Sequence, residues 1–134
     1  MTRRSIKRTI VWAAIQLAVT TCAAASAKEV HGRTYVLGQG ADAVRVIEVW
    51  GSPYEMGYAH GYLIRGELKQ YWSTFLAIIK GVMGVTDAQL DRAWQVMSRH
   101  IAGEFKEEMR GLAAGAGVPE QWVHWMHILS LIHI

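Results

Sequence analysis

Histidines are the side chains with the clearest potential for chemistry in this sequence. His124 and His127 are three positions apart, a spacing at which two imidazoles on a helix can face one metal ion. The pattern places neither cysteines nor carboxylates with them, so we expect no metal site. His60 falls on the apolar side of a predicted helix, which favours a hydrogen-bonded core histidine, with a pocket-lining position as the alternative.

Three glutamates, Glu104, Glu107 and Glu108, are the candidates for an acid and base pair. Two carboxylates can share that chemistry when their environments separate their pKa values, which requires burial of at least one. These three follow the polar side of a predicted helix, so a solvated face is favoured, with Glu107 directed toward Arg110 or Lys106. Taken alone, these residues name no reaction.

Cys22 is the single cysteine, and it lies within a predicted secretory leader. Residues 1–27 have a basic start, an apolar stretch and the small-residue exit Ala25-Ser26-Ala27. The apolar stretch is far shorter than the roughly 20 residues that span a bilayer. We therefore predict cleavage after Ala27, an exported protein that is periplasmic or secreted, and no stable membrane anchor. Arg3-Arg4 leaves the general and the twin-arginine export routes both open.

Removal of the leader changes the charge balance of the chain. The formal net charge is +3, but four of the fourteen basic residues belong to the leader, so ten then face eleven acidic residues. A net charge of about −1 without a stripe of Lys and Arg favours no nucleic acid partner. Loss of Cys22 also leaves the mature chain without a thiol for a nucleophile, a disulfide or a metal.

The last six residues, 129–134, read Leu-Ser-Leu-Ile-His-Ile. They match the translation of a transposon-end adapter that is ligated to DNA in sequencing libraries. We interpret them as foreign to the protein and exclude them from the fold. An ordinary apolar end of a helix or strand is the alternative.

Two short strands and a long helix are predicted in the first half of the mature chain. Residues 34–37 and 44–50 are rich in β-branched and aromatic side chains, and the stretch between them has turn chemistry, which predicts a hairpin. Ser52-Pro53-Tyr54-Glu55 combines a cap, a first-turn proline and a capping-box glutamate. A long helix is expected to begin there and to end at residues 81–84.

Gly57 and Gly61 lie one turn apart within that predicted helix. Each costs about 1 kcal/mol relative to alanine in a helix interior, so some compensating contact is expected. Close approach of another backbone is the physical use of such a pair. We expect this part of the helix to pack tightly on a sheet or on a neighbouring helix.

Three further helices complete the predicted fold. Thr86 and Gln89 form a second capping box that opens a helix reaching Ile101, a third stripe covers residues 105–116, and Pro119 begins the last helix. The class is α+β: a short β-hairpin followed by three to four helices.

Two blocks of the chain resemble one family of enzymes. Residues 47–61, Ile-Glu-Val-Trp-Gly-Ser-Pro-Tyr-Glu-Met-Gly-Tyr-Ala-His-Gly, resemble the opening of the acyl-coenzyme A:6-aminopenicillanate acyltransferase family. Residues 107–117, Glu-Glu-Met-Arg-Gly-Leu-Ala-Ala-Gly-Ala-Gly, are similar to a second segment of that family, in the same order and at a fitting separation.

The resemblance implies an autoproteolytic N-terminal-nucleophile (Ntn) hydrolase with an αββα sandwich. Such a precursor cuts itself before a cysteine, whose thiol then attacks a linear amide or another acyl substrate. No cysteine follows Cys22, so no catalytic residue can be assigned here, and residues 28–128 would form the part before the nucleophile. The implied partners are the remainder of the precursor and a small-molecule amide or acyl substrate. No cofactor is implied, and this fragment alone is expected to be inactive.

The resemblance also suggests roles for residues in the first block. Tyr54, Tyr58 and His60 are hypothesised to line the substrate cleft. The structural motif that matches the family consists of Gly51, Ser52, Pro53, Glu55, Gly57 and Gly61. A non-catalytic periplasmic helical module that binds a partner through exposed Trp and Met, and a histidine-based metal carrier, are the alternatives.

Overall fold

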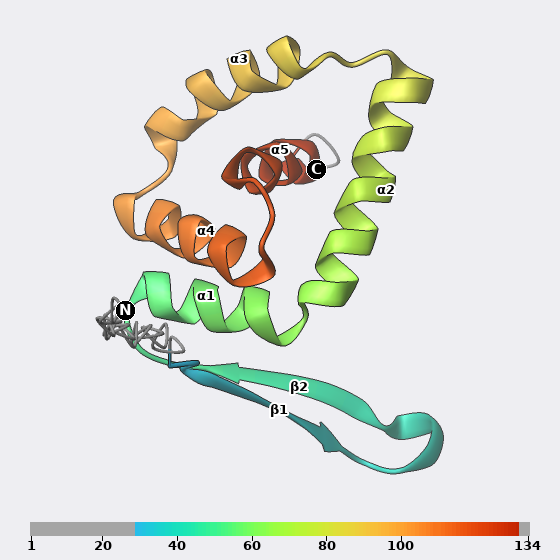
Figure 1. Cartoon of the computed structure of the whole chain (residues 1–134), viewed down its shortest axis with the longest axis vertical. Coiled ribbons are helices and arrows are strands. Elements are labelled where there is room, and N and C mark those ends of the chain that lie inside the picture. The colour runs from blue at the N-terminus through green and yellow to red at the C-terminus, as the bar shows by residue number, and fades with distance from the viewer. Residues whose placement is uncertain (1–28, 132–134) are drawn as a thin grey trace, which may run out of the picture.

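A computed structural model describes residues 29–131 of the chain (Figure 1). The predicted leader with Cys22 lies outside the described residues, as do the last three positions of the adapter-like segment. A two-stranded antiparallel hairpin is followed by five α-helices, which confirms an α+β fold. None of the helices within residues 29–131 is both long and apolar enough to cross a membrane.

The hairpin pairs β1 (Gly32–Leu37) with β2 (Val44–Val49) around a short 3-10 turn, η1 (Gly40–Asp42). Pairing runs from Gly32 opposite Val49 to Leu37 opposite Val44, so the predicted hairpin is confirmed, with β1 beginning two residues earlier than expected. Gly38 and Gly40 have φ angles of 82° and 58°, which glycine adopts without strain. Figure 1 shows the hairpin reaching beyond the helices.

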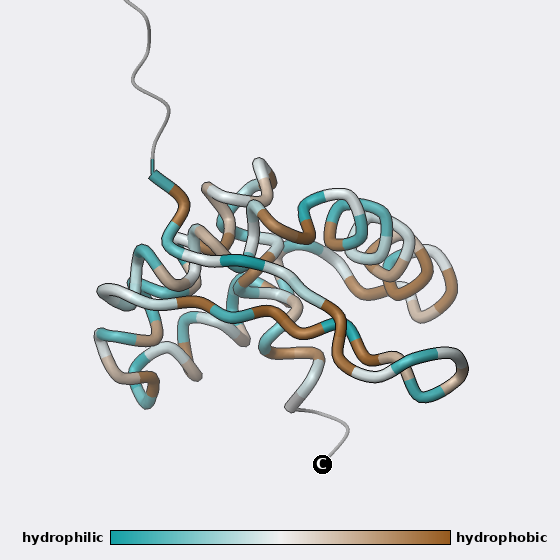
Figure 2. Tube along the Cα trace, turned by 90° about the horizontal axis from the view of Figure 1, so that it is seen from below, coloured by the Kyte–Doolittle hydropathy of each residue, from teal (hydrophilic) through white to brown (hydrophobic). Residues whose placement is uncertain are grey.

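The hairpin carries apolar residues on both of its faces. One face rests on the first helix, because a methyl group at Gly32 would lie 3.0 Å from the Ala59 Cβ atom. The opposite face carries the Arg33–Glu48 ion pair and, toward the turn, four apolar side chains, as the alternation along each strand requires: Tyr35, Leu37, Val44 and Val46. Leu37 and Val44 are 56% and 60% exposed. Figure 2 shows hydrophobic positions recurring along β2 and at the turn end of β1.

The single long helix predicted from Ser52 onward is wrong, because two helices form: α1 (Pro53–Leu63) and α2 (Arg65–Met83). Ile64 breaks the run with φ −123° and ψ 27°. The two segments bury against different partners, α1 against α4 and α2 through Trp72 and Leu76 against the core, so a straight helix could not satisfy both. The predicted end is confirmed, since Gly84 caps α2 in the left-handed conformation.

The remaining helices are α3 (Asp87–Met97), α4 (Gly103–Ala116) and α5 (Glu120–Leu131), with a short 3-10 turn, η2 (Ser98–His100), after α3. The capping box of Thr86 and Gln89 is confirmed. The expected extension of this helix to Ile101 is wrong, because Ile101 is extended and leads into α4. Five helices thus replace the three to four that were expected.

Helix α5 lies at the centre of the helical part, surrounded by α2, α3 and α4 (Figure 1). Its Trp125 packs with Leu76, Leu90 and Ile128 in one core cluster, and its Val123 packs with Trp72 and Met109 in another. Leu129, the first residue of the adapter-like segment, also lies in the first cluster and is 8% exposed. Most of the apolar burial therefore depends on α5.

Candidate functional site

The start of α1 is the best-ordered polar arrangement within the resembling blocks. The Ser52 backbone N–H and Oγ–H donate to Glu55 Oε2 at 2.8 and 2.7 Å, and the Glu55 N–H donates to Ser52 Oγ at 3.4 Å. Pro53 occupies the first turn, where a missing N–H costs nothing. The capping box read from the sequence is therefore confirmed, and it fixes where α1 leaves the sheet.

His31, which immediately precedes β1, lies beside this capping box, and the sequence analysis did not predict it. Its Nδ1 lies 3.6 Å from Glu55 Oε1, and its Nε2 lies 3.8 Å from Glu29 Oε2. The hairpin register creates the contact, because the Trp50 N–H donates to the His31 carbonyl at 3.0 Å. The only signal in the sequence was the position of His31 opposite the end of the strand that precedes Ser52.

Gly51 makes room for this cluster. Its φ of 105° is a conformation that other residues rarely adopt, and a Cβ there would lie 2.9 Å from His31 Nδ1 and 2.7 Å from Glu55 Oε2. The strand therefore turns into α1 at a position that accepts only glycine.

The His31 Nδ1 atom is buried and lies beyond hydrogen-bond distance of any described partner.

Helices α1 and α4 pack backbone to backbone through four glycines. A methyl group at Gly57 would overlap the Glu108 carbonyl, and one at Gly61 would overlap the Leu112 carbonyl. The contact is reciprocal, since Gly111 and Gly115 of α4 meet the carbonyls of α1 in the same way. The close approach predicted for the first glycine pair is confirmed, and its partner is the second resembling block.

The three hypothesised cleft residues do not share one environment. Tyr54 and Tyr58 place their carbonyls against Gly111 and Gly115, and the Tyr58 ring stacks on Tyr62 with centroids 6.2 Å apart. His60 is half-buried, whereas the fully buried positions of α1 are Gly57, Ala59 and Gly61. Because the tight contact uses the glycine side of α1, the expectation that His60 is a core histidine is wrong.

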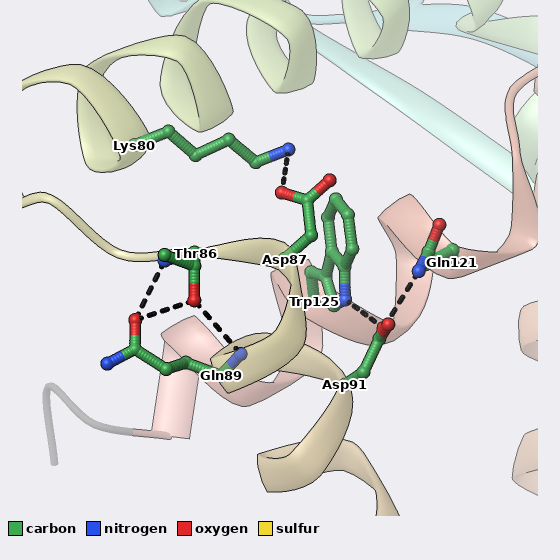
Figure 3. Close-up of polar contacts among 7 residues, drawn as sticks. All are labelled: Lys80, Thr86, Asp87, Gln89, Asp91, Gln121 and Trp125. Carbon is green, nitrogen blue, oxygen red and sulfur yellow. Dashed lines mark hydrogen bonds and ion pairs between the residues drawn. The ribbon is translucent and has the colours of Figure 1, made fainter.

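A polar network joins α2, α3 and α5 around Trp125 (Figure 3). Asp91 Oδ1 accepts hydrogen bonds from Gln121 Nε2 at 2.8 Å and from Trp125 Nε1 at 2.9 Å, and these bonds lower the pKa of Asp91. Lys80 Nζ lies 4.3 Å from the Trp125 ring centroid and 2.6 Å from Asp87 Oδ1. The network satisfies the indole N–H of a side chain that is only 2% exposed, so it stabilises the fold.

His124 and His127 have different neighbours, although both belong to α5. His124 stacks on Trp94 at 3.9 Å between centroids, and its Nε2 lies 3.3 Å from Glu120 Oε1, so the expectation that no carboxylate accompanies it is wrong. Burial lowers the pKa of His124, and Glu120 opposes that shift. His127 instead places Nδ1 2.8 Å from the Val123 carbonyl oxygen. Within residues 29–131 no three His, Cys, Asp or Glu side chains are grouped as a metal site.

The three glutamates of α4 also have different surroundings. Glu107 forms an ion pair with Arg110, one of the two partners expected for it. Glu104 is exposed, and Glu108 is half-buried beside Phe105, Met109, Leu112 and His127. Recesses of 250–360 Å³ that the described residues form on α2 to α5 are lined by side chains other than Tyr54, Tyr58 and His60. The cleft role of those three residues stays a prediction.

Comparison with known proteins finds relatives that are much longer than this chain. Protein dcd1A of Dictyostelium discoideum is 23% identical over 119 residues, covering 73% of this chain and 27% of that protein. Protein dcd1B of the same organism is 26% identical over 125 residues, covering 76% and 25%. An uncharacterized protein of Archaeoglobus fulgidus is 32% identical over 99 residues, covering 66% and 16%. No family model and no solved structure matches the chain.

Proposed function

We propose that this chain is the N-terminal part of an exported, autoproteolytic cysteine hydrolase of the Ntn class that acts on linear amide bonds. Acyl transfer to an amine is the alternative outcome of the same acyl-enzyme. The chain spans about a quarter or less of the length of the relatives that it matches. In this proposal it is the segment before the nucleophile. By itself this segment is proposed to be inactive.

One observation carries the proposal: the two blocks that resemble the family form one structural unit. The first block comprises the second half of β2, the Ser52 cap and the glycine side of α1, and the second comprises most of α4. These blocks are distant in sequence, yet Gly57 and Gly61 meet Gly111 and Gly115 along a shared contact. A methyl group at any of the four glycines would overlap a backbone carbonyl of the other helix, so the packing of each block depends on the other.

The two-sided hairpin supports the sandwich part of the proposal. One face of β1 and β2 rests on α1, and the other is apolar in its half nearer the turn, beyond the Arg33–Glu48 ion pair, where it presents Tyr35, Leu37, Val44 and Val46. Antiparallel strands with one solvated face carry polar residues there, whereas strands between two layers are apolar on both. A second sheet from the remainder of the polypeptide would cover this face in an αββα arrangement.

The proposed chemistry uses groups outside this chain. Self-cleavage would free a cysteine whose α-amine, with a reference pKa of about 7.7–8.0, takes the proton of its own thiol. The sulfur attacks the amide carbonyl carbon, the C–N bond breaks, and the amine leaves with that proton. Water then attacks the thioester, which releases a carboxylic acid and restores the thiol. The chain described here holds the sheet edge and helices that scaffold the site.

The test begins with the mature protein produced from its intact gene. Mass spectrometry should find two chains, the second beginning with cysteine, and replacement of that cysteine by alanine should leave one uncut chain without amidase activity. Replacement of another cysteine or a distant serine serves as the control. A single chain that is never cut, or activity that survives the cysteine variant, would overturn the proposal.

A non-catalytic binding module is the second candidate, and one surface favours it. Ile78, Val82 and Met83 on α2 are 51%, 79% and 66% exposed. The tryptophans divide, because Trp72 and Trp125 are buried whereas Trp50 is 47% exposed. An uncut chain without amidase activity in the experiment above would favour this candidate over the enzyme.

A further inference from the structure

A recess between α4 and α5 combines an apolar floor with two polar groups. Its volume is 250 Å³, and it is lined by Phe105, Glu108, Met109, Leu112 and His127. The four α4 residues follow the spacing of one helix face, so they line the recess in a continuous row. Met109 is 6% exposed and forms part of the core, whereas Phe105 is 53% exposed.

His127 enters the recess in a defined tautomer. Its Nδ1 lies 2.8 Å from the Val123 carbonyl oxygen, and a carbonyl can only accept a hydrogen bond. Nδ1 therefore carries the hydrogen in the neutral ring, which leaves Nε2 with a lone pair. A ligand in the recess would meet this ring as a hydrogen-bond acceptor.

Glu108 supplies the charge. Its neighbour Glu107 is paired with Arg110, whereas the Glu108 carboxylate makes no hydrogen bond or ion pair with any residue in the range 29–131. The Glu108 backbone is fixed, because its carbonyl packs against Gly57 in the contact with α1. No lysine or arginine lines the recess to neutralise the carboxylate.

We propose that this recess binds an organic ammonium group that carries an apolar body. Glu108 supplies the opposite charge, and His127 Nε2 accepts a second hydrogen bond from the ammonium. Phe105, Met109 and Leu112 contact the apolar part. A carboxylate and a neutral acceptor above an apolar floor select a cationic donor and reject anions and neutral polar groups of the same size.

The test is calorimetric titration of the mature protein, produced from its intact gene, with 2-phenylethylammonium. We expect saturable binding at one site, and binding of the uncharged analogue 2-phenylethanol that is at least about tenfold weaker, as the loss of a charge-assisted hydrogen bond requires. Glu108→Gln should weaken binding of the ammonium by a similar factor. Binding does not depend on turnover, so the result is independent of the reaction proposed above.

Glu104→Gln is the matched control, because Glu104 lies on the same helix, is exposed and does not line the recess. It should change the affinity by less than about twofold, as expected for an exposed charge. No saturable binding up to the solubility limit of the probe would overturn the proposal, and so would an equal loss in both glutamine variants. If Glu108→Gln does not fold, the comparison of the charged and uncharged probes decides.

Discussion

The α1–α4 contact and the α3–α5 contact hold helices together by opposite means. At the first, glycines on both helices bring the two backbones into direct contact. At the second, side chains make the contact, because the Trp125 indole N–H donates to Asp91 and His124 stacks on Trp94. An added side-chain atom should therefore destabilise the first contact. The stability of the second should depend on the polar groups of its side chains and on pH.

The largest expected effect is at the glycine contact. Gly57→Ala places a methyl group in the Glu108 carbonyl, and neither backbone can yield without separating the helices. We expect a loss of about 3 kcal/mol in the free energy of unfolding, the upper part of the range for overpacking, although alanine favours the helix itself. Denaturant unfolding of the mature protein measures it.

Gly81→Ala is the control for that prediction. Gly81 lies inside α2, and a Cβ there would have no neighbour within 4 Å. The same substitution should therefore stabilise the protein by up to about 1 kcal/mol. Equal effects at Gly57 and Gly81 would show that helix propensity, and not the close approach, governs both positions.

A smaller loss is expected at the side-chain contact. Trp125→Phe removes the indole N–H that donates to Asp91 and leaves part of a buried volume empty. We expect a destabilisation of about 1–3 kcal/mol, measured by the same unfolding experiment. Trp50→Phe, at a residue that is 47% exposed, should change stability much less. A neutral Trp125→Phe would mean that this network contributes no stability.

The smallest effect is a dependence on pH that arises at the α3–α5 contact. Burial lowers the pKa of His124 from its ordinary value of 6.5, so the unfolded chain binds a proton more readily than the folded one. Stability is then complete above about pH 6.5 and falls as the pH decreases toward the lowered pKa of the folded state. His124→Phe keeps an aromatic ring against Trp94 and should flatten this slope in thermal unfolding at a series of pH values. An unchanged slope would assign it to other groups.

Local chemistry in the sequence predicted the parts of this fold that depend on a few adjacent residues. The Ser52–Glu55 and Thr86–Gln89 caps and the turn at Gly84 all follow from such local patterns. The need for a partner at Gly57 was also readable, because unsupported glycines weaken a helix.

Features that depend on distant partners were not predictable in the same way. The break at Ile64 arises because α1 and α2 pack on different helices, and nothing local marks it. His31 reaches Glu55 only through the hairpin register, and Asp91 meets Trp125 from another helix. A single histidine or aspartate in a sequence does not indicate which distant residues it contacts in the fold.

The interlocked glycines have a consequence for exchanging parts between relatives. Residues 53–63 and 103–116 pack through complementary glycines. A chimaera that takes only one of these helices from a homologue would therefore combine two surfaces that do not fit each other. The residues between them, which form α2, α3 and their connections, take no part in the glycine contact and pack in the core with α5. Recombination within this region should therefore succeed when both segments come from the same parent.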